Sequence, residues 1–149
     1  TEMAAWYASQ GMTLYDALQA LFKKYGYYGE RTMNLVMPGL DGMRDMAAIM
    51  EQLHKAPLTE VAGTAVTAQK DYLSGTVTDP ATGAVIPMEL KDSNVVAYDL
   101  ADGTTFIIRP SGTEPKIKVY VLAHGGSQAE CDEKLAKYTS FADVIKTMA

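Results

Sequence analysis

The sequence predicts an α+β fold with two layers, in which a mainly antiparallel sheet carries helices on one face. Its 149 residues, 48% of them hydrophobic and 21% charged, fit one domain with a sizeable core and exclude a disordered chain. Apolar residues recur at helical spacing near both ends of the chain, whereas the middle alternates apolar and polar residues between short turns. Because tight turns place consecutive strands side by side in opposite directions, we expect an antiparallel sheet rather than a doubly wound one.

Two helices are expected before residue 26. The first covers residues 2–10 and would end at Gly11. The second starts after Thr13, which can cap it together with Asp16, and ends before Gly26. Its apolar positions are Leu14, Leu18, Leu21, Phe22 and Tyr25. Since the helical pattern gives way to a strand pattern after Gly26, we place a boundary there.

A strand and a third helix follow this boundary. Residues 28–37 alternate between two faces and end at Pro38, which predicts a strand. Asp41 can cap a helix that Pro57 prevents from extending far beyond His54. The expected buried stripe of this helix is Met43, Met46, Ala47, Met50 and Leu53. Methionines at this spacing are typical of a core and do not indicate a metal site.

The rest of the chain is predicted to form strands and one last helix. The expected strands lie within residues 61–72 and at residues 76–78, 84–86, 95–100, 104–109 and 116–123. Asp102-Gly103 is a strong hairpin signal between two of them. Ser127 with Glu130 predicts the start of the last helix, and a break near Thr139 stays open. Its expected stripe is Cys131, Leu135, Tyr138, Phe141 and Ile145.

Charge and cysteine content exclude several classes of function. The formal net charge of −5 disfavours nucleic acid and anionic membranes as partners, so a bound phosphate would have to be held by local geometry. The single cysteine, Cys131, can form no internal disulfide, and no N-terminal leader is recognisable, which favours the cytoplasm. The longest apolar runs are far shorter than the roughly 20 residues that span a membrane. Since an amphipathic pattern begins almost at Thr1, we expect a piece of a longer chain.

The segment between the last two predicted strands suits the capture of an anion. Arg109 ends one strand with a guanidinium that can make two parallel hydrogen bonds to a phosphate. Ser111 and Thr113 add hydroxyl donors, and Gly112 between them allows turned backbone N–H groups and a close approach by a ligand. The same composition is also typical of an ordinary turn. From the residues alone, both interpretations stay open.

A resemblance to a known family favours the anion site over the ordinary turn. It is carried by residues 109–118, which read Arg-Pro-Ser-Gly-Thr-Glu-Pro-Lys-Ile-Lys. They resemble the phosphate-binding loop in the C-terminal domain of the α-D-phosphohexomutases, the family of phosphoglucomutase, phosphomannomutase and phosphoglucosamine mutase. Residues 21–45 resemble the junction between the third and fourth domains of bacterial phosphoglucomutases, and residues 66–75 are similar to the same subgroup. The resemblance therefore covers nearly the whole chain and favours a phosphoglucomutase-like parent.

The resemblance implies a site and a parent enzyme. The implied ligands of the non-reacting phosphate of a hexose phosphate are Arg109, Ser111, Gly112 and Thr113, with Lys116 and Lys118 as further candidates. In the family, a phosphoserine of the first domain exchanges its phosphoryl group with the sugar through a hexose 1,6-bisphosphate. An Asp-x-Asp-x-Asp loop of the second domain holds Mg²⁺, and the third domain contacts the sugar.

This chain has neither a serine-histidine pair of that kind nor the aspartate loop, so we expect no catalytic residue, no metal and no bound cofactor in it. The resemblance implies that residues 1–26 are a helical remnant of the third domain and that residues 27–149 are the C-terminal phosphate-binding domain. The expected partners are a hexose phosphate and the N-terminal domains of the same longer chain. Glucose, mannose and pentose phosphates stay open as substrates, as do two other classes of function: a stand-alone sugar-phosphate or anion-binding module, and a domain used for assembly.

Four other polar side chains are given structural roles. Glu114 would repel a phosphate and is expected to bond to the backbone or to an arginine. His54 and His124 are isolated in the sequence and predict no metal site. Cys131 lies on the apolar stripe of the last helix, so we expect a buried, unreactive thiol.

Overall fold

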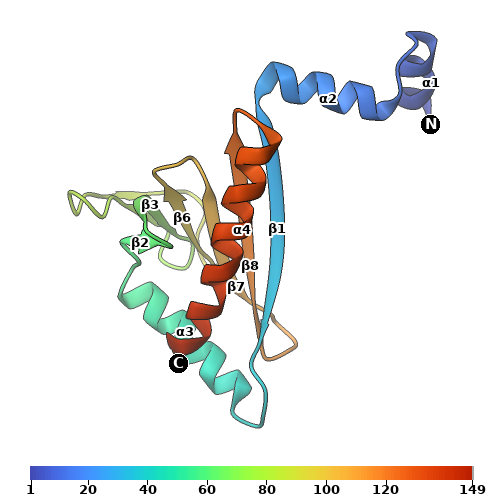
Figure 1. Cartoon of the computed structure of the whole chain (residues 1–149). Coiled ribbons are helices and arrows are strands. Elements are labelled where there is room, and N and C mark those ends of the chain that lie inside the picture. The colour runs from blue at the N-terminus through green and yellow to red at the C-terminus, as the bar shows by residue number, and fades with distance from the viewer. Residues whose placement is uncertain (149) are drawn as a thin grey trace.

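The computed structural model describes residues 1–148. Its elements in chain order are α1 (Glu2–Ser9), α2 (Leu14–Tyr25), β1 (Tyr27–Val36), α3 (Gly42–Lys55), β2 (Glu60–Val61), β3 (Thr64–Asp71), β4 (Thr76–Thr78), β5 (Val85–Pro87), β6 (Val96–Leu100), β7 (Thr105–Pro110), β8 (Lys116–Gly125), α4 (Gln128–Ile145) and the 3-10 helix η1 (Lys146–Met148) (Figure 1). The expected order of helices and strands is confirmed.

All strands belong to one antiparallel sheet, as predicted. The strand order is β1-β8-β7-β6-β3-β4-β5, with β2 paired to β3 beside this path. The longest pairing joins β1 to β8 over ten residue pairs, from Tyr27 opposite Gly125 to Val36 opposite Lys116. The turn at Asp102 joins β6 to β7, so the hairpin predicted there is confirmed, and a second, smaller hairpin joins β4 to β5.

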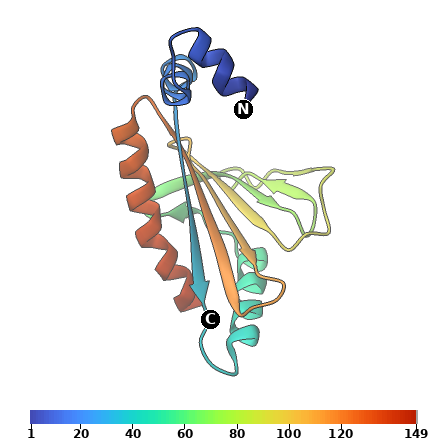
Figure 2. The same cartoon turned by 90° about the vertical axis from the view of Figure 1, so that its right-hand side faces the viewer.

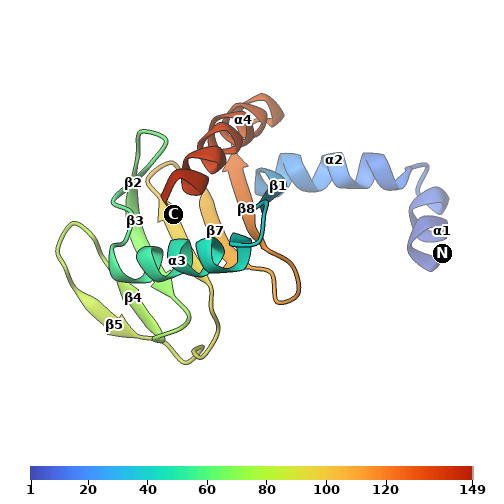
Figure 3. The same cartoon turned by 90° about the horizontal axis from the view of Figure 1, so that it is seen from below.

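Helices α3 and α4 cover one face of this sheet and leave the other open. Helix α4 lies along β1 and β8 (Figure 2). Helix α3 contacts β7 and β8 and lies at the end of the sheet that faces the viewer in Figure 3. One continuous core joins side chains of both helices to alternate residues of the strands, among them Leu35, Phe106, Ile108, Ile117 and Val119. The alternation buries every second residue of β7 and β8 and turns the residues between them to the open face.

Helices α1 and α2 project from the end of β1 and contribute no side chain to this core (Figure 1). Thr13 and Asp16 form the expected reciprocal capping box at the start of α2. Ala17 is the one buried residue of the two helices. Their large apolar side chains that stay exposed are Met3, Trp6, Leu14, Tyr15, Leu18, Leu21 and Tyr25.

The orientation of α3 differs from the prediction. Ile49 is fully buried, whereas Met43 is half exposed and Ala47 is exposed, so the buried stripe is rotated around the helix. Asp41 makes no side-chain cap and instead pairs with Arg44, with Oδ1 and Nη1 3.1 Å apart. The sheet against which the helix packs sets this rotation, and the spacing of its own apolar residues does not.

Helix α4 is continuous from Gln128 to Ile145. Thr139 and Ser140 bond back to carbonyl oxygens four residues earlier and cause no break in it. Phe141, expected on the apolar stripe, is partly buried and packs against the core, and Ala142 beside it is buried. None of the helices within residues 1–148 has the length and apolarity needed to cross a membrane.

A polar cluster fastens α4 to the turn between β6 and β7. The hydroxyl of Tyr138 donates to Asp102 Oδ2 at 2.6 Å and lies 2.8 Å from Thr64 Oγ1. Burial alone would raise the pKa of Asp102, but the hydrogen bonds from Tyr138 and from the Thr104 N–H outweigh it and hold this pKa below its usual value. Desolvation, with Asp102 close by, raises the pKa of Tyr138 to about 12.

Candidate functional site

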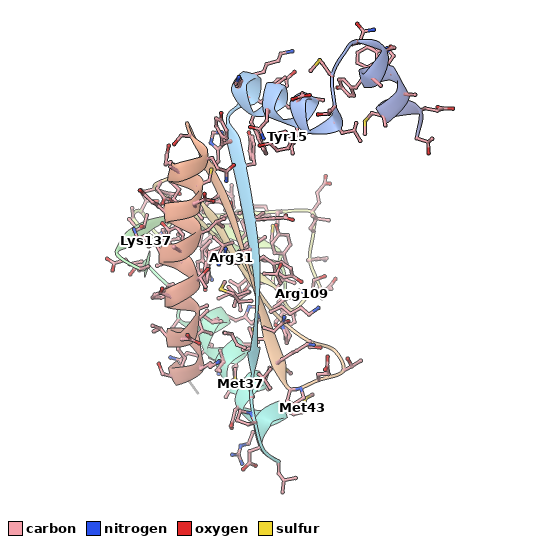
Figure 4. All side chains as sticks on the ribbon, turned by 45° about the vertical axis from the view of Figure 1, so that its right-hand side comes forward. Tyr15, Arg31, Met37, Met43, Arg109 and Lys137 are labelled. Atoms are coloured by element: carbon pink, nitrogen blue, oxygen red, sulfur yellow. The ribbon has the colours of Figure 1, made fainter. Side chains whose placement is uncertain are left out.

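Strands β7 and β8 bring two cationic side chains together on the open face of the sheet. Arg109 lies directly opposite Lys118 in the antiparallel register. Their chain neighbours Ile108, Ile117 and Val119 are fully buried on the helix-covered face. Figure 4 shows Arg109 on the side of the sheet away from α4, while Arg31 lies toward the helix. The alternation that builds the core therefore places both cations in one exposed position.

Lys116 forms an ion pair with a carboxylate, whereas Arg109 and Lys118 do not in the part of the chain that the structure describes. The Nζ of Lys116 lies 2.5 Å from Glu114 Oε2. The hydrogen bond and charge of Lys116, with a weaker contribution from Lys118, lower the pKa of Glu114. Within residues 1–148, Arg109 and Lys118 form no ion pair, and Arg109 Nε donates to the hydroxyl of Tyr120 at 3.3 Å. Glu114 thus pairs with Lys116, and not with the backbone or an arginine as was expected, whereas Arg109 and Lys118 have no carboxylate within ion-pair distance in the described residues.

Residues 111–115 connect the two strands and carry free backbone donors. The Ser111 N–H donates to the Lys116 carbonyl at 2.8 Å, and the Lys116 N–H donates to the Glu114 carbonyl at 2.7 Å. Between these bonds, the N–H groups of Gly112, Thr113 and Glu114 donate to no backbone acceptor in the described part of the chain. Three successive unpaired donors beside two cations form an environment suited to an anion.

Gly112 contributes space and not an unusual backbone conformation. Its φ lies outside the left-handed region, so the conformational freedom that glycine allows at this position is not used. A Cβ built on Gly112 would meet no heavy atom within 4 Å. The space beside this backbone is therefore open to a ligand.

The base of this connection contacts the segment between β1 and α3 and the first residue of α3. The Met37 N–H donates to the Pro115 carbonyl at 2.8 Å, which continues the pairing of β1 beyond its end. A Cβ on Gly42 would lie 2.3 Å from the Met37 carbonyl oxygen and 3.0 Å from Pro115 Cβ, so only glycine fits there. One backbone hydrogen bond and one close packing contact thus anchor the loop at Pro115.

The structure brings together most of the residues that the sequence singled out. Arg109 and Lys118 meet through the strand register, and the connection that holds Ser111, Gly112 and Thr113 begins one residue beyond Arg109. Sequence reasoning missed Tyr120. The available signal was its position two residues after Lys118, which puts both side chains on one face of a strand.

The remaining candidates lie outside this region and form no metal site. His54 bridges Asp71 Oδ1 at 3.0 Å and Asn94 Oδ1 at 2.9 Å, while His124 packs on the ring of Tyr28 at the far end of β8. Cys131 is fully buried, and burial raises the pKa of its thiol. Among residues 1–148, no three histidine, cysteine, aspartate or glutamate side chains gather as metal ligands.

Comparison with known proteins identifies the family. Residues 34–137, more than half of the chain, match the family model described as phosphoglucomutase/phosphomannomutase, C-terminal domain. The chain belongs to this family. The matched span contains the whole candidate site, from Arg109 to Tyr120.

Relatives in the phosphoglucomutase/phosphomannomutase family are much longer than this chain. A phosphoglucomutase of Staphylococcus aureus is 35% identical over 119 residues, which cover 77% of this chain and 21% of that protein. A phosphoglucomutase of Staphylococcus haemolyticus is 34% identical over 133 residues, 87% of this chain and 24% of that protein. The open form of parafusin, a phosphoglucomutase from Paramecium, aligns with 92% of this chain and 23% of its own at 14% identity and a TM-score of 0.48. The chain thus spans about a fifth to a quarter of these relatives.

Proposed function

We propose that this chain is the phosphate-binding C-terminal part of a phosphoglucomutase or phosphomannomutase, and that it grips the phosphate of a hexose phosphate that is not being transferred. The observation that carries the proposal is the uncompensated pair of Arg109 and Lys118 beside three unpaired backbone N–H groups. Like charges directly opposite each other destabilise a sheet, so an anion that binds between them relieves a cost that the empty site bears. Family membership and the greater length of the relatives favour this function over a stand-alone binding module.

In this proposal, each element of the site has a separate task. The guanidinium of Arg109 provides a fork of N–H donors, and Lys118 adds charge. The hydroxyls of Ser111 and Thr113 and the backbone beside Gly112 supply the remaining hydrogen bonds. Fixing one phosphate orients the rest of the sugar for phosphoryl transfer elsewhere in the parent enzyme, so this chain contributes positioning and not bond making.

The same proposal assigns residues 1–26 to the end of a preceding domain and residues 27–149 to the C-terminal domain. Helices α1 and α2 support it, because they lie outside the core and expose Trp6, Leu14 and Leu18. Mg²⁺ and the hexose 1,6-bisphosphate intermediate belong to the rest of the parent enzyme. The isolated chain is therefore expected to bind a phosphosugar and to show no mutase activity.

A titration of the chain with glucose 6-phosphate, followed by NMR, tests the site. Arg109→Ala should weaken binding at least tenfold, because a bond between a charged group and phosphate contributes about 1.5–3 kcal/mol. Arg31→Ala is the matched control, since it removes the same charge from the opposite side of the sheet. Equal affinities of wild type and Arg109→Ala would show that the site is assigned wrongly, and mutase activity in the purified chain would contradict its role as a binding part alone.

A further inference from the structure

We propose that Tyr120 is a positioning residue for Arg109, holding the guanidinium in place for a phosphate through a hydrogen bond to its Nε. The inference rests on the proposed function and extends it to a residue behind the phosphate ligands. It starts from one contact, in which Arg109 Nε donates to Tyr120 Oη at 3.3 Å.

The strand register places Tyr120 where it can reach Arg109. Tyr120 is two residues beyond Lys118 on the same face of β8, and it pairs with Ile107 of β7 and with Thr32 of β1. Arg109 is therefore its diagonal neighbour across the β7–β8 pair, a separation that long side chains bridge. Neither side chain has to leave the open face to form the bond.

The bond leaves the ligand-binding part of the guanidinium free. Arginine has five N–H donors in a fixed plane, one on Nε and four on the two Nη atoms. With Nε engaged by Tyr120, the two Nη atoms remain as a fork that matches two phosphate oxygens. Because Lys118 lies directly opposite Arg109 and carries the same charge, the bond to Tyr120 restrains a guanidinium that its neighbour repels.

A phenol suits this task better than a carboxylate. A carboxylate would hold Arg109 more tightly but would cancel its charge, as Glu114 does for Lys116, which lies four residues before Tyr120 on β8. The hydroxyl of Tyr120 is a neutral acceptor, so it orders the side chain and leaves the positive charge for the phosphate. An ordered arginine loses less rotamer freedom when it binds.

Tyr120→Phe tests this role, since it keeps the ring and removes the acceptor. The first readout is the Arg109 Nε–Hε resonance of the unliganded chain, identified by its loss in Arg109→Lys. In Tyr120→Phe it should move toward the position of a solvent-exposed arginine and exchange faster with water. The second readout is the affinity for inorganic phosphate, which should fall roughly threefold to tenfold. Tyr28→Phe is the matched control, because Tyr28 lies on the same open face at the far end of β1.

The outcomes separate this inference from the proposed function. If Arg109→Ala weakens phosphate binding while Tyr120→Phe binds as wild type does, Arg109 is a ligand and the positioning role of Tyr120 is wrong. An unchanged Hε resonance in Tyr120→Phe likewise overturns the role. If phosphate binding is insensitive to Arg109→Ala, the proposed function itself fails. A loss of affinity in both Tyr120→Phe and Tyr28→Phe would point to a general effect on the sheet and also count against positioning.

Discussion

Replacing Lys118 by glutamine is expected to stabilise the folded chain and at the same time to weaken phosphate binding. The two effects have opposite signs because the positive charge of Lys118 opposes Arg109 in the empty site and helps it only when an anion is present. Glutamine keeps most of the length of the side chain and its polarity, so the charge is the main quantity that changes.

The size of the expected stability change follows from the pairing of Arg109 opposite Lys118. Like charges directly opposite each other in an antiparallel pair cost about 0.2–1 kcal/mol. Lys118 also attracts Glu114, although more weakly than Lys116 does, and this attraction offsets part of the gain. We therefore expect Lys118→Gln to raise the free energy of unfolding by about 0.5 kcal/mol at low salt. The loss of one exposed cation from the phosphate site should weaken binding by roughly fivefold, or about 1 kcal/mol.

Urea unfolding at two salt concentrations measures the first effect. At about 0.5 M NaCl the Debye length shrinks to roughly 4 Å, so the stabilisation should largely vanish. The second effect is measured by the rise in unfolding temperature on addition of phosphate, which should be smaller for Lys118→Gln than for wild type. Lys116→Gln is the control, because it breaks the pair with Glu114 and should not stabilise the chain. The reasoning is refuted if Lys118→Gln is no more stable than Lys116→Gln at low salt, or if phosphate stabilises it as much as wild type.

Three further predictions concern the glycine, the polar cluster and the projecting helices. Gly112→Ala should leave urea unfolding nearly unchanged, because its Cβ meets no atom within 4 Å, yet weaken phosphate binding in an NMR titration by filling the ligand's space; unchanged binding would contradict this. Tyr138→Phe should cost about 1–2 kcal/mol at pH 7 in urea unfolding. Since the pKa of Asp102 is lowered, this contribution is present above its ordinary value of 3.8 and is lost as pH falls through the folded pKa, so a pH-independent loss would argue against it. Deletion of residues 1–20 should change the unfolding free energy by less than about 1 kcal/mol, because none of their side chains joins the core, and should reduce any self-association seen by light scattering; a larger loss of stability would show that the helices belong to the domain.

The fold could be predicted from the sequence wherever local chemistry decides the structure. Thr13 with Asp16 formed the predicted capping box, and Asp102-Gly103 formed the predicted hairpin turn, because both depend on residues a few positions apart. The rotation of α3 was predicted incorrectly, with Met43 expected in the core and Ile49 omitted. Several apolar stripes were compatible with that helix, and the surface of the sheet selects one of them.

In the candidate site, too, the local features could be predicted from the sequence and the features that depend on strand pairing could not. Arg109 and its loop could be found from a short contiguous motif and a resemblance. The partner of Glu114, the uncompensated charge of Lys118 and the contact made by Tyr120 depend on which residues of β7 and β8 stand opposite each other. A register is set by the packing of a whole sheet face, so no spacing within one strand reveals it.

The buried face of β7 and β8 also fixes the geometry of the proposed phosphate site on the exposed face. A slip of one residue in the β7–β8 pairing would turn Ile108 and Val119 outward and carry Arg109 and Lys118 into the core, where unpaired charges cost several kcal/mol each. Burial of these apolar side chains therefore fixes the β7–β8 register, and this register places Arg109 opposite Lys118. Because the open face takes its geometry from the buried one, substitutions at Lys118 or Tyr120 can change phosphate affinity while the fold that positions Arg109 stays intact.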